Sequence, residues 1–111
     1  MGARGREGPA RAVEARVKVH YSEEAEQDLV EIGLYTWTEW GEEQYLEYMA
    51  LLRDACEDII PRKRRLARGV PGKPDVRRWR CERHVIFFRQ VRDGIEIVRV
   101  VHERMLPTRY L

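Results

Sequence analysis

The sequence has 111 residues, of which 43% are hydrophobic and 36% are charged, with a net charge of +2. A chain of this length has room for one hydrophobic core, and no apolar run approaches the roughly 20 residues that a membrane-spanning helix requires. We therefore expect a single cytoplasmic domain over residues 16–111 that has no contact with a membrane. Residues 1–15 lack the apolar stretch of a secretory signal, and their composition predicts a flexible extension.

Sequence motifs for metal, cofactor or phosphate-loop chemistry are absent. The chain has no CxxC pair, HExxH motif or glycine-rich phosphate loop, and we expect neither a metal nor a cofactor. Cys56 and Cys81 are interpreted as reduced, buried thiols rather than as a disulfide. His20, His84 and His102 fall at the ends of predicted strands, where a structural role is the ordinary one. Cys81 and His84 are three positions apart, a spacing that places them on opposite faces of one strand and argues against a nucleophile–base pair.

The charge is strongly segregated along the chain. Residues 22–60 contain twelve acidic residues and one base, Arg53, whereas residues 61–80 contain nine bases and one acid, Asp75. Part of this charge can be neutralised inside the fold. Nine cations within twenty residues nevertheless predict a surface that attracts an anionic partner.

A short strand followed by a helix is predicted at the start of the domain. Val17, Val19 and Tyr21 alternate with polar residues, as in a half-buried strand. Ser22 is placed to cap the following helix, which we expect to run to about Trp40, and acidic residues fill its first turn.

This first helix has two apolar stripes on nearly opposite faces. One stripe consists of Ala25, Leu29, Ile32 and Trp40. The other consists of Val30, Leu34 and Trp37. Burial of the second stripe under the next helix is the expected arrangement, and the alternative is a surface left open for a partner.

A second helix is expected over residues 42–60, after a break at Gly41 and with Pro61 as its end. The short break implies an antiparallel helical hairpin. The basic run 62–65 and the run 71–74, which contains two prolines, are interpreted as an irregular linker.

The remainder of the chain predicts a small sheet. Strands are expected near residues 76–81, 84–90 and 95–102, with a turn at Arg92-Asp93-Gly94 between the last two. The element order is then β-α-α-β-β-β. This order describes an α+β domain in which a helical hairpin packs on a mainly antiparallel sheet.

Three blocks of sequence resemble the ParE toxins of the RelE/ParE superfamily. They are SEEAEQDLVEIGLYTWTEWG (22–41), RHVIFFR (83–89) and IEIVRVVHERM (95–105), and the resemblance extends over about residues 17–106. It implies the toxin of a type II toxin–antitoxin module of the plasmid-stabilisation kind. It also implies a ParD-like antitoxin as partner and DNA gyrase as target, with growth arrest as the outcome.

The alternative implied by the same superfamily is a ribosome-dependent mRNA endoribonuclease of the RelE type. The arginine-rich linker is compatible with this alternative, because such enzymes use cations around the scissile phosphate. Its candidate catalytic residues would be His102, Arg83 and Glu103, or Glu82 in place of Glu103. Under the gyrase interpretation no catalytic residue is expected, and we favour this interpretation because convincing base candidates are few.

Two candidate binding surfaces follow. The predicted antitoxin-binding residues are Val30, Leu34 and Trp37. The predicted target-binding residues are Arg77, Arg78, Arg80, Arg83, His102, Arg104 and Arg109. They are also the candidates for a nucleic-acid contact made through the target. Strand alternation places Arg78 and Arg80 on one face and directs Trp79 and Cys81 inward. The tail 105–111 resembles the toxic end of the family and is expected to contribute little to the core.

Overall fold

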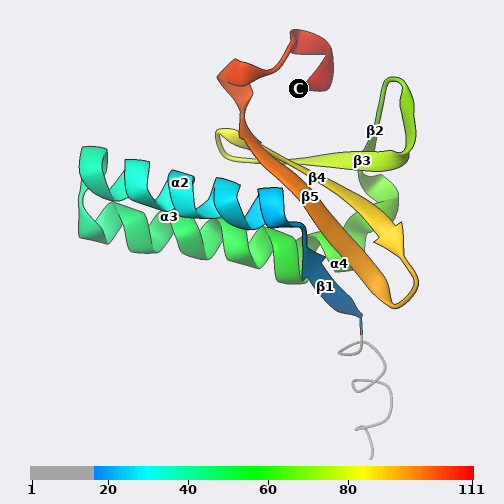
Figure 1. Ribbon diagram of the computed structural model, residues 1–111, viewed down its shortest axis with the longest axis horizontal. Coiled ribbons are helices and arrows are strands. Elements are labelled where there is room, and N and C mark those ends of the chain that lie inside the picture. Colours follow the sequence, from blue (N-terminus) through cyan, green and yellow to red (C-terminus); the bar gives the residue numbers. More distant parts are fainter. Residues whose placement is uncertain (1–16) are drawn as a thin grey trace, which may run out of the picture.

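The computed structural model describes residues 17–111, which form an α+β fold with a helical hairpin and one five-stranded sheet (Figure 1). The strand order is β1-β5-β4-β3-β2, and only β1 pairs in parallel, with β5. The principal elements are β1 (Lys18–Tyr21), α2 (Glu23–Trp40), α3 (Glu42–Asp54), α4 (Ile60–Lys63), β2 (Arg68–Val70), β3 (Lys73–Cys81), β4 (His84–Val91) and β5 (Gly94–His102). The predicted fold class is confirmed, while the proposed extension over residues 1–15 lies outside the described residues.

The helical hairpin forms as its sequence predicts. Ser22 caps α2, because its hydroxyl oxygen accepts a hydrogen bond from the Ala25 amide at 2.9 Å. Gly41, at a φ of 91°, ends α2 and reverses the chain. The helices approach closely at Gly33, where a Cβ atom would lie 2.9 Å from the Tyr45 ring. The contact line between the helices therefore runs past a glycine.

The prediction that Pro61 ends the second helix is wrong. After α3 the chain continues through a π-helical turn (Ala55–Ile59) into α4 and a 3-10 turn (Arg64–Leu66). The Ile60 amide donates to the Ala55 carbonyl, five residues back. This wider turn precedes Pro61, so the proline lies at the start of a new helical segment, where its missing N–H costs little.

The expectation that the runs 62–65 and 71–74 form an irregular linker is wrong in part. The first run lies in α4 and the 3-10 turn, the second includes the beginning of β3, and strand β2 lies between the two runs. Gly72, at a φ of 78°, lies in the turn that joins the two strands. Pro74 lies within β3, at a position that is in register with neither β2 nor β4. No ladder position is lost there, and the proline is tolerated.

Close approach and a bulge determine the register of β5. A Cβ atom at Gly94 would lie 1.9 Å from the Lys18 carbonyl oxygen, so only glycine allows β1 to pair there. Phe87 of β4 pairs with Arg99, whereas the next residue, Phe88, pairs with Ile97. Val98 is thus an extra residue, and the alternation along β5 shifts at this bulge. Simple alternation from Ile95 to Val101 could not predict the shift.

The core lies between the helices and one face of the sheet. Its buried members are Ala25, Leu52, Ala55, Cys56, Ile60, Ala67, Ile86, Phe88, Ile95, Ile97 and Val100. Asp28 of α2 bonds to β5 beyond the part of this strand that pairs with β1. Its carboxylate accepts hydrogen bonds from the Val100 amide at 2.9 Å and from the Arg99 guanidinium at 2.7 Å. This carboxylate also raises the pKa of Arg99. The contact positions α2 along the sheet.

The carboxy-terminal tail covers part of the opposite face of the sheet (Figure 1). The Tyr110 ring meets Phe87 edge-on at 6.5 Å between centroids, and Arg78 Nη2 donates to the Arg109 carbonyl oxygen at 3.1 Å. Val85 is buried but does not belong to the cluster beneath the helices. None of residues 105–111 belongs to the buried core, so the expectation that the tail contributes little to the core is confirmed, although Tyr110 covers Phe87 on the other face. Within residues 17–111, no helix is long and apolar enough to cross a membrane.

Candidate functional site

The helical hairpin is the part of the described chain that has most of the exposed large hydrophobic side chains. We call this area the hairpin surface, and its members are Val30, Leu34, Tyr35, Trp37, Trp40, Leu46 and Leu51. Outside it, the described residues include only two other exposed large hydrophobic side chains, Leu66 and Met105. The hairpin extends beyond the sheet, so its tip has no cover from any other described element (Figure 1). Such a patch is characteristic of a protein interaction site.

The expected burial of the second stripe under the next helix is wrong. Val30 and Leu34 are 64% and 67% exposed, and Trp40, from the first stripe, is 68% exposed. The residues of α2 that become buried beside Ala25 are Gly33 and Thr36. Small side chains at the contact line allow the helices to approach, and this leaves the large side chains outside.

Trp37 is held in place within the hairpin surface. Its ring contacts Tyr45 edge-on, with 5.1 Å between centroids and 64° between the planes, and the residue remains 48% exposed. A tryptophan that is already oriented loses little conformational freedom when a partner covers it. The three predicted antitoxin-binding residues, Val30, Leu34 and Trp37, are all accessible on this surface.

Acidic side chains surround the hairpin surface. The exposed acidic residues of α2 and α3 are Asp54 and the glutamates Glu23, Glu24, Glu26, Glu31, Glu39, Glu42, Glu43 and Glu47. Among the described residues, none of these glutamates forms an ion pair. The charge complementary to this surface is therefore positive.

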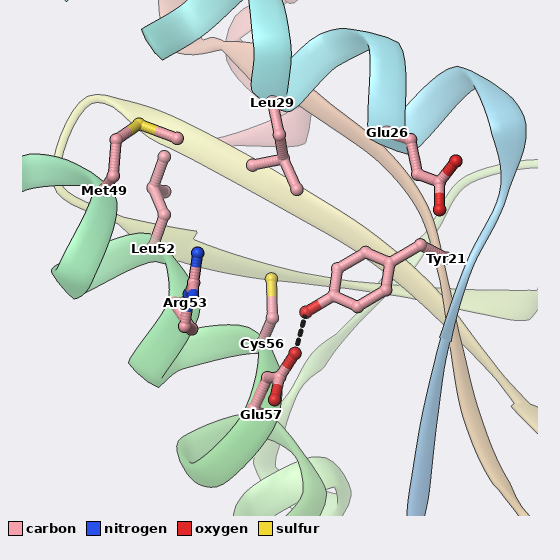
Figure 2. A pocket seen from close by; sticks show the side chains of 8 residues that line it. All are labelled: Tyr21, Glu26, Leu29, Met49, Leu52, Arg53, Cys56 and Glu57. Carbon is pink, nitrogen blue, oxygen red and sulfur yellow. Dashed lines mark hydrogen bonds between the residues drawn. The ribbon is translucent and has the colours of Figure 1, made fainter.

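A groove of about 360 Å³ opens between α2, α3 and the end of β1 (Figure 2). Its lining residues are Tyr21, Glu26, Leu29, Met49, Leu52, Arg53, Cys56 and Glu57. The Tyr21 hydroxyl donates to Glu57 Oε2 at 2.6 Å and closes one end. Burial raises the pKa of Cys56 to about 12, so its thiol stays protonated and is a poor nucleophile. The groove has the character of a socket for an apolar side chain with a charged rim.

A histidine cluster that the sequence interpretation did not anticipate lies at the β3–β4 turn. Cys81 and His84 are directly opposite each other across this two-residue turn and share a face, so the argument that placed them on opposite faces was wrong. The Tyr48 hydroxyl lies 2.6 Å from His84 Nδ1. The rings of His84 and His102 meet edge-on, 5.1 Å apart. Recognition of the turn between residues 81 and 84 would have revealed the shared face.

His84 and Tyr48 of this cluster are uncharged near neutral pH. Burial, followed by the neighbouring His102, lowers the pKa of His84 to about 4, and burial raises that of Tyr48 to about 12. The Arg83 amide donates to the Tyr48 oxygen, which leaves the hydroxyl hydrogen for His84 Nδ1. His102 Nδ1 accepts from the Arg104 amide at 3.0 Å. These bonds give the ring nitrogens a structural role.

The predicted target-binding residues separate into two groups. The side chains of Arg80, Arg83, His102 and Arg104 lie at the end of the sheet, where Arg80 pairs with Glu103 and the Glu103 amide donates to the Arg83 carbonyl oxygen at 2.8 Å. This region also contains the residues named for the endoribonuclease alternative. Within residues 17–111, neither Arg83 nor Arg104 forms an ion pair.

The second group lies near β2. Arg77 donates to the Ala67 carbonyl oxygen at 3.2 Å, and Arg78 donates to the carbonyl oxygens of Gly69 and Arg109. Arg77 therefore braces the segment after α4, whereas Arg78 faces the tail. Trp79 and Cys81 pack against the core, as alternation along the strand predicted.

This fold defines a small α+β protein with an uncovered helical hairpin. The solved structure described as "Chromosomal ParDE TA system from P. aeruginosa" shares the fold, with a TM-score of 0.60 at 19% identity over 79% of this chain and 97% of that chain. A family model described as "ParE toxin of type II toxin-antitoxin system, parDE" matches residues 19–107. The chain belongs to the ParE toxin family, and it is the toxin of a type II toxin–antitoxin system.

Curated relatives agree with this assignment. Toxin ParE1 of Mycobacterium tuberculosis strain CDC 1551 / Oshkosh is 32% identical over 83 residues, which represent 73% of this chain and 84% of the relative. Toxin ParE1 of strain ATCC 25618 / H37Rv gives the same values.

Proposed function

We propose that this toxin inhibits DNA gyrase in the cytoplasm and that a ParD-like antitoxin neutralises it by covering the hairpin surface. Membership of the ParE family and the ParDE system named for the similar structure support a ParD-like partner. The observation that carries the antitoxin part is the exposure of Val30, Leu34 and Trp37 on a hairpin tip that no described element covers.

The chemistry around the hairpin surface defines the antitoxin segment that would fit. An amphipathic helix could place apolar residues on Trp37 and its neighbours, as in other helix-in-groove complexes. Basic residues at its margins would meet the exposed glutamates of α2 and α3. One apolar side chain of the same segment could enter the groove beside Leu29 and Leu52.

Target inhibition by binding, rather than by RNA cleavage, is supported by the state of the imidazoles. RNA cleavage requires a base that can take a proton from the 2′-hydroxyl close to cations. His84 is buried and bonded to Tyr48, and His102 has one ring nitrogen occupied by a backbone amide. The cations of Arg83 and Arg104 are well suited to docking on an acidic surface of the target.

Brief expression of the toxin in cells distinguishes the two targets. Gyrase inhibition should induce the DNA damage response and double-strand breaks while translation continues at first. Co-expression of the antitoxin with the wild-type toxin should prevent both the DNA damage response and the double-strand breaks. Rapid translation arrest with cleaved transcripts and without DNA breaks would overturn the gyrase proposal.

A further inference from the structure

The sheet edge formed by β2, together with the segments next to it on both faces, has positive charge that the described ion pairs do not neutralise. We call it the cationic corner, and its members are Lys63, Arg65, Arg68, Lys73 and Arg78, from α4, the following turn, β2 and β3. Of the nine bases in residues 61–80, the described ion pairs involve only Arg62, with Asp58, and Arg80, with Glu103. The prediction that this segment is too basic to be neutralised internally agrees with these contacts.

One arginine of the corner bonds to neutral carbonyl groups. Arg78 donates to the carbonyl oxygens of Gly69 and Arg109. A carbonyl oxygen orients a guanidinium but leaves its full positive charge in place. The bonds therefore fix this side chain without reducing the field that it projects.

The pairing of β2 with β3 places like charges opposite each other. Arg68 and Arg78 are direct cross-strand partners, an arrangement that costs free energy in an antiparallel sheet. Hydrophobic or oppositely charged residues would stabilise this position better. A sheet that keeps two arginines there is consistent with a polyanionic ligand that offsets their repulsion when it binds.

The composition of the corner favours a double-stranded ligand. Residues 61–78 contain no Phe, Tyr, Trp or His, and the nearby Tyr110 ring packs edge-on against Phe87, whereas proteins that bind single strands stack bases on aromatic side chains. The exposed aromatic residues Tyr35, Trp37 and Trp40 lie on the hairpin instead. Residues 61–66, which include Lys63 and Arg65 of the corner, line a shallow hollow of about 400 Å³. Charge without stacking groups suits a duplex backbone, where the phosphates are exposed and the bases are paired.

We propose that the cationic corner binds the phosphate backbone of duplex DNA without reading its sequence. The hairpin surface and the corner lie on different parts of the molecule (Figure 1), so the antitoxin and DNA can bind together. The choice of DNA rests on the proposed gyrase target, because gyrase holds a DNA duplex. The corner would then contact the DNA segment that gyrase carries.

Equilibrium binding of the full chain to a fluorescein-labelled duplex DNA of arbitrary sequence, measured by anisotropy at several salt concentrations, tests the proposal. The test variant carries Lys63→Gln, Arg65→Gln and Lys73→Gln, whose side chains are exposed and make no hydrogen bond or ion pair within residues 17–111. The control variant carries Lys18→Gln, Arg53→Gln and Arg92→Gln, which remove the same charge from elsewhere on the surface.

The proposal expects binding that weakens steeply with salt. Loss of three phosphate contacts should reduce the slope of log K against log salt by roughly 2 to 3 and weaken binding at low salt by about tenfold or more. The control should change binding less than about threefold. Equal loss in the two variants, or tighter binding of a single strand or an RNA duplex, would overturn it.

Failure of this inference is distinguishable from failure of the gyrase proposal. The DNA titration contains no gyrase, so it reports on the corner alone. If the protein inhibits gyrase but does not bind duplex DNA, only the proposed DNA binding by the cationic corner is contradicted. A protein that binds duplex DNA through the corner but leaves gyrase unaffected contradicts only the gyrase target.

Discussion

The hydroxyl oxygen of Tyr48 lies 2.6 Å from Nδ1 of His84, and this contact joins α3 to the sheet at the β3–β4 turn. The same oxygen accepts the Arg83 amide at 3.3 Å, so one phenol bonds to both a side chain and the turn. Glu82, the other turn residue, has a φ of 55°, which is unfavourable for a residue with a side chain. The phenol therefore helps to hold a strained turn against the helices.

Tyr48→Phe should destabilise the protein by about 1 to 3 kcal/mol. The substitution leaves the buried His84 nitrogen without its donor, and an unsatisfied buried polar group costs more than the bond itself contributes. Urea unfolding of the free toxin measures the change. Tyr35→Phe is the matched control, because Tyr35 is 63% exposed and its hydroxyl makes no hydrogen bond within residues 17–111. Equal stabilities for the two variants would show that the contact contributes nothing.

His84 should make stability depend on pH in the acidic range. Its pKa falls from 6.5 to about 4 in the folded protein, so the unfolded chain binds the proton first as pH decreases. The stabilisation is complete above pH 6.5 and is lost as pH falls towards 4, by on the order of 3 kcal/mol. Urea unfolding at neutral pH and near pH 4, compared with His84→Gln, isolates this contribution. A variant with the same pH dependence would rule out His84 as the source.

Trp37→Ala should weaken antitoxin binding by about 2 kcal/mol or more, which is roughly thirtyfold. The ring is half-exposed and already oriented by Tyr45, so its loss removes a prepared anchor. Calorimetric titration with the cognate antitoxin measures the effect. Leu66→Ala is the control, since this side chain is 73% exposed but lies outside the hairpin surface. Unchanged affinity for Trp37→Ala with an intact fold would exclude the hairpin surface as the interface.

Different residues of the tail should contribute to toxicity and to stability. Met105 is 74% exposed, so Met105→Ser should leave the unfolding free energy unchanged while weakening growth arrest, if the tail contacts the target. Tyr110→Ala, which removes the ring beside Phe87, should lower stability by about 1 kcal/mol. Growth assays and thermal unfolding of both variants provide the comparison. Full toxicity for Met105→Ser would show that this side chain does not take part in the target contact.

The local signals in the sequence predicted most of the fold. Ser22 and Gly41 delimit α2 because a side-chain cap and a positive φ are properties of single residues. The Arg92–Asp93 turn is also local, with Val91 and Gly94 paired across it. Alternation correctly predicted that Trp79 packs against the core.

The features that the sequence did not reveal depend on tertiary contacts. A proline is compatible with a continuing helix when the turn before it is a wider π-helical turn, as at Ala55–Ile59. The residues before Pro61 gave no clear sign of such a turn in the sequence. The bulge at Val98 appears only in the pairing with β4. Trp37 and Trp40 stay exposed because the two helices approach each other at Gly33. The spacing of large apolar residues in the sequence does not predict a helix contact at a glycine. The bond between Tyr48 and His84 joins residues 36 positions apart, beyond any local pattern.

Gyrase inhibition is tested most directly by incubating the purified toxin with DNA gyrase, supercoiled plasmid and ATP, and by measuring linear DNA after denaturation of the enzyme. The proposal predicts that linear DNA accumulates with increasing toxin and that prior addition of the antitoxin prevents it. A gyrase that supercoils normally at saturating toxin, while the same preparation cleaves mRNA on ribosomes and loses this cleavage with His102→Ala, would contradict the proposal.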